Sequence, residues 1–315
     1  MCLKDCLIIW LMLKFQFENI EELKNLHYNA VEDYVKRLAE DIQDAVYASV
    51  IKLKGFEDYH AARNKADYTW LKQFILADLD TMRAWVTNQP DELKFTEFQA
   101  LYGSKFSNGI DNFVDSAGTY NAYTLIEKMN LNVCPYCDDE YLDVVKSDDK
   151  TRRTSEFDHF FPEGKSKYPA LAMCFYNLVL SGQNCNGLKL QKELGASPYD
   201  EDIEKLTFLY PDLDIGVNMD SVTPNECEVL LHAKGGMVTN EKVLGLKERY
   251  ANRKGEAYQL LKRKQQFPDE KLDEMIRMGI IDSKKEILDV LFGSAYEEGK
   301  FKELHQKMKH DLTGY

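Results

Sequence analysis

The residues best suited to chemistry lie within residues 131–192. Cys134 and Cys137 are separated by two residues, the spacing at which a tight turn directs two thiolates at one tetrahedral zinc ion. The same spacing occurs in redox-active pairs and in pairs of core cysteines, so the pair alone leaves metal binding open. Cys185 follows later in the same stretch and offers a third thiolate, which favours a metal site.

An acid and a histidine stand side by side between these cysteines. Asp158 and His159 lie at the end of a predicted strand over residues 155–158. Neighbours on a strand point to opposite faces, so a strand that ends or bulges here can direct Asp158 to a metal ion and leave His159 free for a water molecule. The alternative is that His159 is a partly buried histidine satisfied by a neighbour. Asn177 ends a short predicted helix, where asparagine is common as a cap.

Taken in order, the elements CxxC, Asp-His, Tyr-Asn-Leu and Cys-Asn with a following lysine resemble an HNH endonuclease of the ββα-metal class. The resemblance is densest over residues 117–192, through YNAYTLIEKMNLNVCPYC and FDHFFP…SKYPALA…YNL, and is looser toward the C-terminus. Within that family the chain is similar to the HNH subunits of bacterial anti-phage defence systems, including Septu-type systems that pair an HNH protein with an ATPase.

The resemblance implies a role for each residue of the motif. Asp158 and Asn186 would bind the catalytic divalent ion. His159 would be the general base, and Asn177 would hold its imidazole by a hydrogen bond. Oxygen ligands suit Mg²⁺ or Mn²⁺, whereas thiolates suit a separate structural zinc ion. The implied zinc ligands are Cys134, Cys137 and Cys185.

The zinc part of the pattern is incomplete. Gly182 stands where the family places the first cysteine of its second pair, and Leu180 stands where proline is usual. Because glycine has no side chain to offer, a four-thiolate site is impossible at the expected positions. Three thiolates with a water, a substitute such as Cys174, or no zinc remain open, and Cys174 can also be a small buried hydrophobe. We expect a retained but weakened zinc site.

Basic side chains around the motif are the expected contacts to nucleic acid. They are Arg152, Arg153, Lys165, Lys167 and Lys189. The whole chain has 40 Lys+Arg against 53 Asp+Glu, and its net charge of -13 excludes a protein that coats nucleic acid by bulk charge. Any polyanion must be held by a local patch, and a solvated loop of mixed charge is the alternative. His305 and His310 fit no ligand spacing and are expected at the surface.

The elements that position this stretch are expected to be mostly helical. Apolar residues recur every three or four positions in several segments, which predicts amphipathic helices. These segments are residues 19–46, 71–86, 120–129, 240–264, 269–278 and 283–292. Capping boxes are expected at Asn19 with Glu22 and at Ser283 with Glu286. Short strands are expected near residues 141–145 and 227–231.

The predicted fold class is α+β, predominantly α-helical, with a central ββα-metal (HNH) module flanked by helical lobes. The chain has 315 residues, enough for about two units at roughly 150 residues per domain. Residues 1–11 are expected to be a start-codon extension before a natural start at Met12. The expected parts are an N-terminal helical lobe at 12–130, the HNH module at 131–192, and a mixed, then helical, C-terminal lobe at 193–315.

Composition also bounds the cellular setting. The seven cysteines are an odd number scattered over a long chain, which favours a reducing, cytoplasmic environment over a disulfide framework. The apolar run over residues 7–13 is far shorter than the roughly 20 residues that span a bilayer, so no membrane partner is expected.

The predicted function is a metal-dependent endonuclease that hydrolyses phosphodiester bonds of DNA, or of RNA, in anti-phage defence. The alternative is a catalytically inactive nucleic-acid-binding or assembly module of a multi-protein complex. The helical lobes are expected to bind a partner, an ATPase by the resemblance, or a second copy of the chain. No glycine-rich phosphate loop is found in the sequence, so any use of ATP would belong to the partner.

Overall fold

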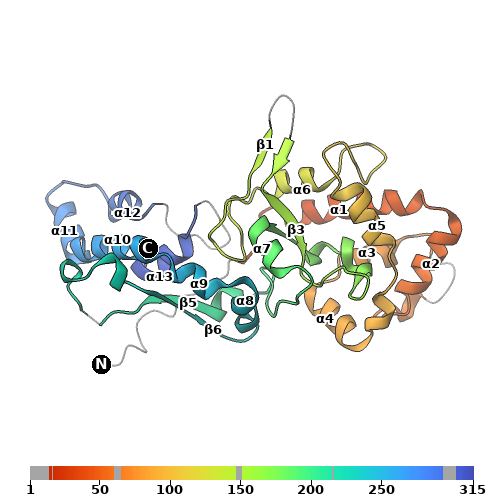
Figure 1. Ribbon diagram of the computed structural model, residues 1–315. Coiled ribbons are helices and arrows are strands. Elements are labelled where there is room, and N and C mark those ends of the chain that lie inside the picture. The colour runs from red at the N-terminus through yellow and green to blue at the C-terminus, as the bar shows by residue number, and fades with distance from the viewer. Residues whose placement is uncertain (1–13, 16, 60–64, 147–150, 215, 294–302) are drawn as a thin grey trace. The chain divides into compact units, whose positions relative to one another are not determined.

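The computed structural model describes residues 14–315, apart from residues 16, 60–64, 147–150, 215 and 294–302 (Figure 1). The expected extension at residues 1–11 and the start at Met12 lie outside the described residues. The chain divides into two compact units. One unit comprises Phe17–Leu131 and Leu142–Glu193, and the other comprises Met1–Gln16, Asn132–Tyr141 and Leu194–Tyr315.

This division differs from the expected three parts. The expected boundaries at 130 and 192 lie next to boundaries of the units, but residues 131–192 do not form a unit of their own. Asn132–Tyr141, which carries the paired cysteines, groups with the C-terminal part of the chain. Leu142–Glu193, which carries Asp158 and His159, groups with the N-terminal helices.

The first part of the unit built on Phe17–Leu131 is helical. Its helices are α1 (Ile20–Lys36), α2 (Glu40–Val50), α3 (Thr69–Ile75), α4 (Leu79–Asn88), α5 (Glu97–Leu101) and α6 (Ala122–Met129), and a π-helical turn (Tyr102–Phe106) continues α5. The helices expected over residues 19–46 and 71–86 are each broken in two. The second break has a clear cause, because the side chain of Asp78 accepts a hydrogen bond from the Thr81 amide and starts α4 anew. Asn19 makes no such bond, so the capping box expected there is wrong.

Aromatic side chains form the core of these helices. Phe74 of α3 stacks on Trp85 of α4 at 5.6 Å and on Phe98 of α5 at 5.7 Å between ring centroids, and all three are buried. Full burial of each such side chain contributes roughly 1.5–3 kcal/mol. Tyr102, in the turn after α5, donates a hydrogen bond of 2.9 Å to the carbonyl of Phe157 and so joins the helices to the strands that carry the motif.

Four short strands follow among the described residues of this unit. β1 (Val144–Lys146) pairs with β2 (Thr151–Arg153), and β3 (Ser155–His159) pairs antiparallel with β4 (Leu178–Gly182). Helix α7 (Gln183–Lys189) begins directly after β4. The connection from β3 to β4 contains 3₁₀ turns at Pro169–Met173 and Phe175–Asn177 in place of the expected α-helix.

The other unit combines one hairpin with six helices among its described residues. β5 (Thr207–Pro211) pairs with β6 (Val229–Ala233), and the helices are α8 (Met237–Leu244), α9 (Leu246–Ala251), α10 (Lys254–Gln266), α11 (Asp269–Arg277), α12 (Lys284–Phe292) and α13 (Gln306–Thr313). The single helix expected over residues 240–264 is interrupted at Gly245, which has a left-handed φ of 61° and ends α8. Ser283 caps α12 by accepting from the Glu286 amide, which is half of the expected capping box. The Glu286 side chain accepts from the Asp282 amide and not from the Ser283 amide, so the second half of the box is wrong.

Two further expectations are settled by this architecture. Helices and small antiparallel sheets together confirm a helix-rich α+β class. His305 is 6% exposed and bonds to Asp139, so its expected surface position is wrong. No described helix is both long and apolar enough to cross a membrane.

Candidate active site

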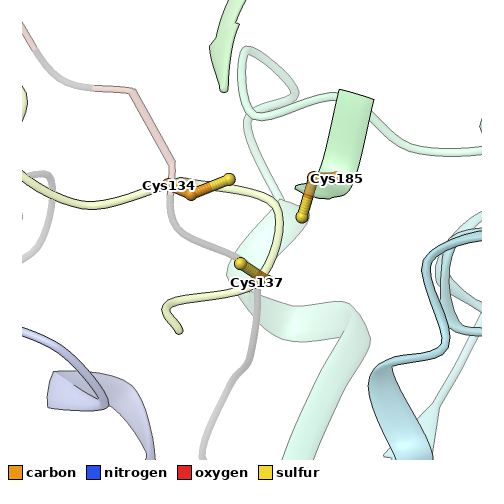
Figure 2. Close-up of side chains that lie close together, drawn as sticks. All are labelled: Cys134, Cys137 and Cys185. Atoms are coloured by element: carbon orange, nitrogen blue, oxygen red, sulfur yellow. The ribbon is translucent and has the colours of Figure 1, made fainter. Parts of the chain in front are cut away.

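Three buried thiols gather where a metal was expected. The Sγ atoms of Cys134, Cys137 and Cys185 all lie within 4.8 Å of one another (Figure 2). This group can hold a metal ion such as zinc. Gly182 is the N-cap of α7 and supplies no fourth ligand. No disulfide joins the described cysteines.

Cys174 does not replace the missing cysteine. Its Sγ lies 3.4 Å from the carbonyl of Phe74, and it is not part of the group of three thiols. Burial raises the pKa of this thiol, which keeps it protonated and unsuited to metal binding. Cys174 therefore behaves as the small buried hydrophobe that the sequence left open.

A cleft of about 650 Å³ opens beside β3 and α7. Its lining includes three of the four residues that the motif singled out, Asp158, His159 and Asn186, whereas Asn177 is fully buried and does not line it. Other polar residues around the cleft are Tyr102, Ser107, Arg153, Glu156, Glu163, Gln183 and Gln191. The motif residues from β3 and α7 therefore share one solvent-accessible space.

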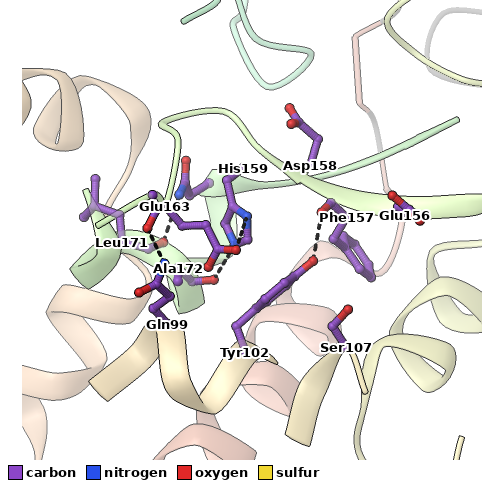
Figure 3. A network of polar contacts seen from close by, with 12 residues as sticks. Gln99, Tyr102, Ser107, Glu156, Phe157, Asp158, His159, Glu163, Leu171 and Ala172 are labelled. Carbon is purple, nitrogen blue, oxygen red and sulfur yellow. Dashed lines mark hydrogen bonds and ion pairs between the residues drawn. The ribbon is translucent and has the colours of Figure 1, made fainter. Parts of the chain in front are cut away.

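The imidazole of His159 has a defined tautomer. Its Nε2 lies 3.0 Å from the carbonyl oxygen of Ala172, and because a carbonyl only accepts, Nε2 carries the proton (Figure 3). Nδ1 is therefore the basic nitrogen, and it lies 3.8 Å from Oε1 of Glu163. The ring packs edge-on against Tyr102 at 4.4 Å. Burial lowers the pKa of His159 to about 3, so the ring is neutral at pH 7.

Asp158 is paired with a lysine inside the protein. Nζ of Lys189 lies 2.9 Å from Oδ1 of Asp158 and donates to the carbonyl of His159 at 2.5 Å. The side chains of Lys189 and Asp158 are 0% and 3% exposed. The expectation that Lys189 contacts nucleic acid is therefore wrong, because its ammonium is enclosed and neutralises a buried carboxylate.

Asn186 contacts an acid that the sequence analysis did not single out. The Nδ2 atom of Asn186 donates to Oε2 of Glu156 at 2.5 Å. Glu156 stands two residues before Asp158 on β3, so the two carboxylates share one face of the strand. The two-residue spacing in the strand was the signal that could have identified Glu156.

Asn177 fixes a loop and does not touch the imidazole. Its Oδ1 accepts from the amide of Phe161 at 2.7 Å, and its Nδ2 donates to the carbonyl of Leu171 at 2.9 Å. Among the described contacts no hydrogen bond joins Asn177 to His159, so the expected bond from Asn177 to the imidazole is wrong. The carbonyl of Ala172 is the group that holds the imidazole. Asn177 positions His159 indirectly, by holding the β3–β4 connection that contains Ala172.

The other basic residues differ in what they can reach. Arg153 lines the cleft, with its guanidinium over the ring of Tyr123 and hydrogen-bonded to Ser107. Lys167 forms an ion pair of 2.9 Å with Glu193. Arg152 and Lys165 are exposed and do not line the cleft. Arg153 is therefore the member of the expected basic set that lies in the cleft.

Comparison of the chain with protein-family models, with curated proteins and with solved structures finds no match in any of the three. The chemistry of the cleft therefore has to be inferred from its own donors and acceptors. Those are a neutral histidine whose Nδ1 faces Glu163, a carboxylate paired with a buried lysine, and an amide held by a second carboxylate.

Proposed function

We propose that the chain is a metal-dependent endonuclease of the HNH type that hydrolyses phosphodiester bonds of DNA, or of RNA. One observation carries the proposal. A buried, neutral His159 with its proton fixed on Nε2 shares a cleft with oxygen donors from β3 and α7. A free imidazole lone pair beside metal-binding oxygens is what hydrolysis of a phosphodiester by activated water requires.

The donors of the cleft fit a hard divalent ion. Asp158 and Asn186 would hold Mg²⁺ or Mn²⁺ through oxygen atoms. Asp158 already pairs with the buried ammonium of Lys189 through Oδ1, so the ion would share this carboxylate with the lysine. When bound, the ion would neutralise negative charge that develops on the phosphate and on the leaving 3′-oxygen.

The protein's own groups supply the proton transfer. Nδ1 of His159 would accept a proton from the attacking water, while the Ala172 carbonyl keeps the ring in place through Nε2. The carboxylate of Glu163, at 3.8 Å from Nδ1, would stabilise the positive charge that the ring gains. Arg153 would face the phosphate from the wall of the cleft. The products would carry 5′-phosphate ends.

The remaining assignments extend the same proposal. Cys134, Cys137 and Cys185 would bind a structural zinc ion with a water as fourth ligand, since Gly182 offers none. The resemblance of the motif supports action in the cytoplasm, in anti-phage defence, with an ATPase or a second copy of the chain as partner. A nuclease endangers its own cell, so control by a partner is physically sensible.

The test uses the purified full chain with supercoiled plasmid and with single-stranded RNA, in Mg²⁺, in Mn²⁺ and in a chelator. We expect metal-dependent cleavage that stops with the chelator and leaves 5′-phosphate ends, read by ligation or by phosphatase-dependent labelling. Nucleic acid retained on a filter without cleavage in either metal would favour the alternative, a binding or assembly module. Cleavage that persists in the chelator would contradict the proposed metal.

A further inference from the structure

The contact between Glu156 and Asn186 restricts how Asn186 can face an ion. A side-chain amide is a donor at its nitrogen and an acceptor at its oxygen, and only the oxygen binds a hard cation. An ionised carboxylate only accepts hydrogen bonds. The 2.5 Å contact between Nδ2 of Asn186 and Oε2 of Glu156 therefore requires that the amide nitrogen face the glutamate.

The opposite end of the amide is then available to the cleft. Among the described residues, Oδ1 of Asn186 accepts no hydrogen bond, and Asn186 lines the cleft together with Glu156 and Asp158. Rotation of the amide by half a turn would set Oδ1 against the Glu156 carboxylate and turn an N–H group toward the ion. Both changes are unfavourable. The negative Oδ1 would meet the negative carboxylate of Glu156, and the positive N–H group would meet the cation.

We propose that Glu156 is a positioning residue that orients the Asn186 amide so that its oxygen serves as a metal ligand. The inference rests on the proposed function, since it takes Asn186 as a ligand. Groups that orient a ligand without touching the ion typically change metal affinity by about 10–100-fold when they are removed. The other possibility is that Glu156 binds the ion itself, and the two roles predict different results in a double variant.

The experiment measures Mn²⁺ binding to the full chain by electron paramagnetic resonance, which detects free Mn²⁺ without any substrate. The variants are Glu156→Ala, Glu156→Gln, Asn186→Ala and the double variant Glu156→Ala/Asn186→Ala. Glu193→Ala, on an exposed acid of the same unit, is the matched control. Thermal unfolding of each protein checks that the fold is retained.

We expect Glu156→Ala to raise the Kd for Mn²⁺ by about 10–100-fold. Asn186→Ala should have an effect at least as large, and the double variant should bind no more weakly than Asn186→Ala alone. Glu156→Gln should be intermediate, because its Oε1 can still accept from Nδ2. The control should leave the Kd unchanged.

Two outcomes would overturn the inference. An unchanged Kd in Glu156→Ala would show that the Asn186 amide needs no such partner. If the fold-increases in Kd of the two single variants multiply in the double variant, Glu156 would be a ligand of the ion. Asp158→Ala separates this failure from that of the proposed function. If Asp158→Ala and Glu156→Ala both bind Mn²⁺ like the wild type, the metal site is refuted together with the inference. If Glu156→Ala binds Mn²⁺ like the wild type while Asp158→Ala binds it more weakly, the inference alone is refuted.

Discussion

Replacement of Lys189 by methionine tests the buried ion pair that organises the cleft. The substitution keeps a long unbranched side chain but removes an ammonium that is 0% exposed and lies 2.9 Å from Oδ1 of Asp158. It also leaves the carbonyl of His159 without its 2.5 Å hydrogen bond. Removal of one partner of a buried pair leaves the other charge uncompensated, and we expect the free energy of unfolding to fall by about 3–5 kcal/mol.

Urea denaturation followed by tryptophan fluorescence measures this loss, because Trp70 and Trp85 are buried in the same unit. Lys165→Met, at an exposed position, is the control and should change the free energy of unfolding by less than about 0.5 kcal/mol. Adding Asp158→Asn to Lys189→Met should restore part of the loss, since no buried charge is then left unpaired. A loss below about 1 kcal/mol in Lys189→Met would refute the pair and the reasoning built on it.

Three further predictions concern pH, zinc and the β3–β4 connection. Burial lowers the pKa of His27 to about 4, so the unfolded chain binds a proton below about pH 6.5 while the folded chain stays neutral. Between pH 7 and pH 5 the free energy of unfolding, measured in urea, should therefore fall by about 2 kcal/mol more in the wild type than in His27→Gln. Metal analysis should find about one zinc per chain, lost in Cys134→Ser but retained in Cys174→Ala; no zinc in the wild type would count against the thiolate site. Asn177→Ala should lower the free energy of unfolding by about 1–3 kcal/mol and reduce cleavage, because buried backbone groups of the connection lose their partners; unchanged stability in urea would argue against that role.

Elements with strong local patterns could be predicted from the sequence. β3 and α6 lie where expected, and α12 begins at its predicted serine cap. β4 could not be predicted in the same way, because it is buried along its whole length and shows no alternation of polar and apolar residues. The breaks inside the expected long helices depend on single residues, such as the aspartate cap of α4, which periodicity alone overlooks.

The candidate site was predictable in its motif residues but not in their contacts. Asp158, His159 and Asn186, which the motif order singles out, all line one cleft. Burial of Lys189 depends on acceptors about thirty residues earlier, and in a sequence such a lysine looks like any surface lysine. The period of two along a strand would have placed Glu156 on the face of Asp158.

The central claim is that the cleft hydrolyses phosphodiester bonds with His159 as the base. The most direct measurement is the initial rate of plasmid cleavage in Mn²⁺ for the wild type and for His159→Ala. His232→Ala, on the exposed face of β6, serves as the matched control. We predict that His159→Ala loses at least about 100-fold in rate while His232→Ala keeps the wild-type rate. Equal rates in the wild type and His159→Ala would contradict the account.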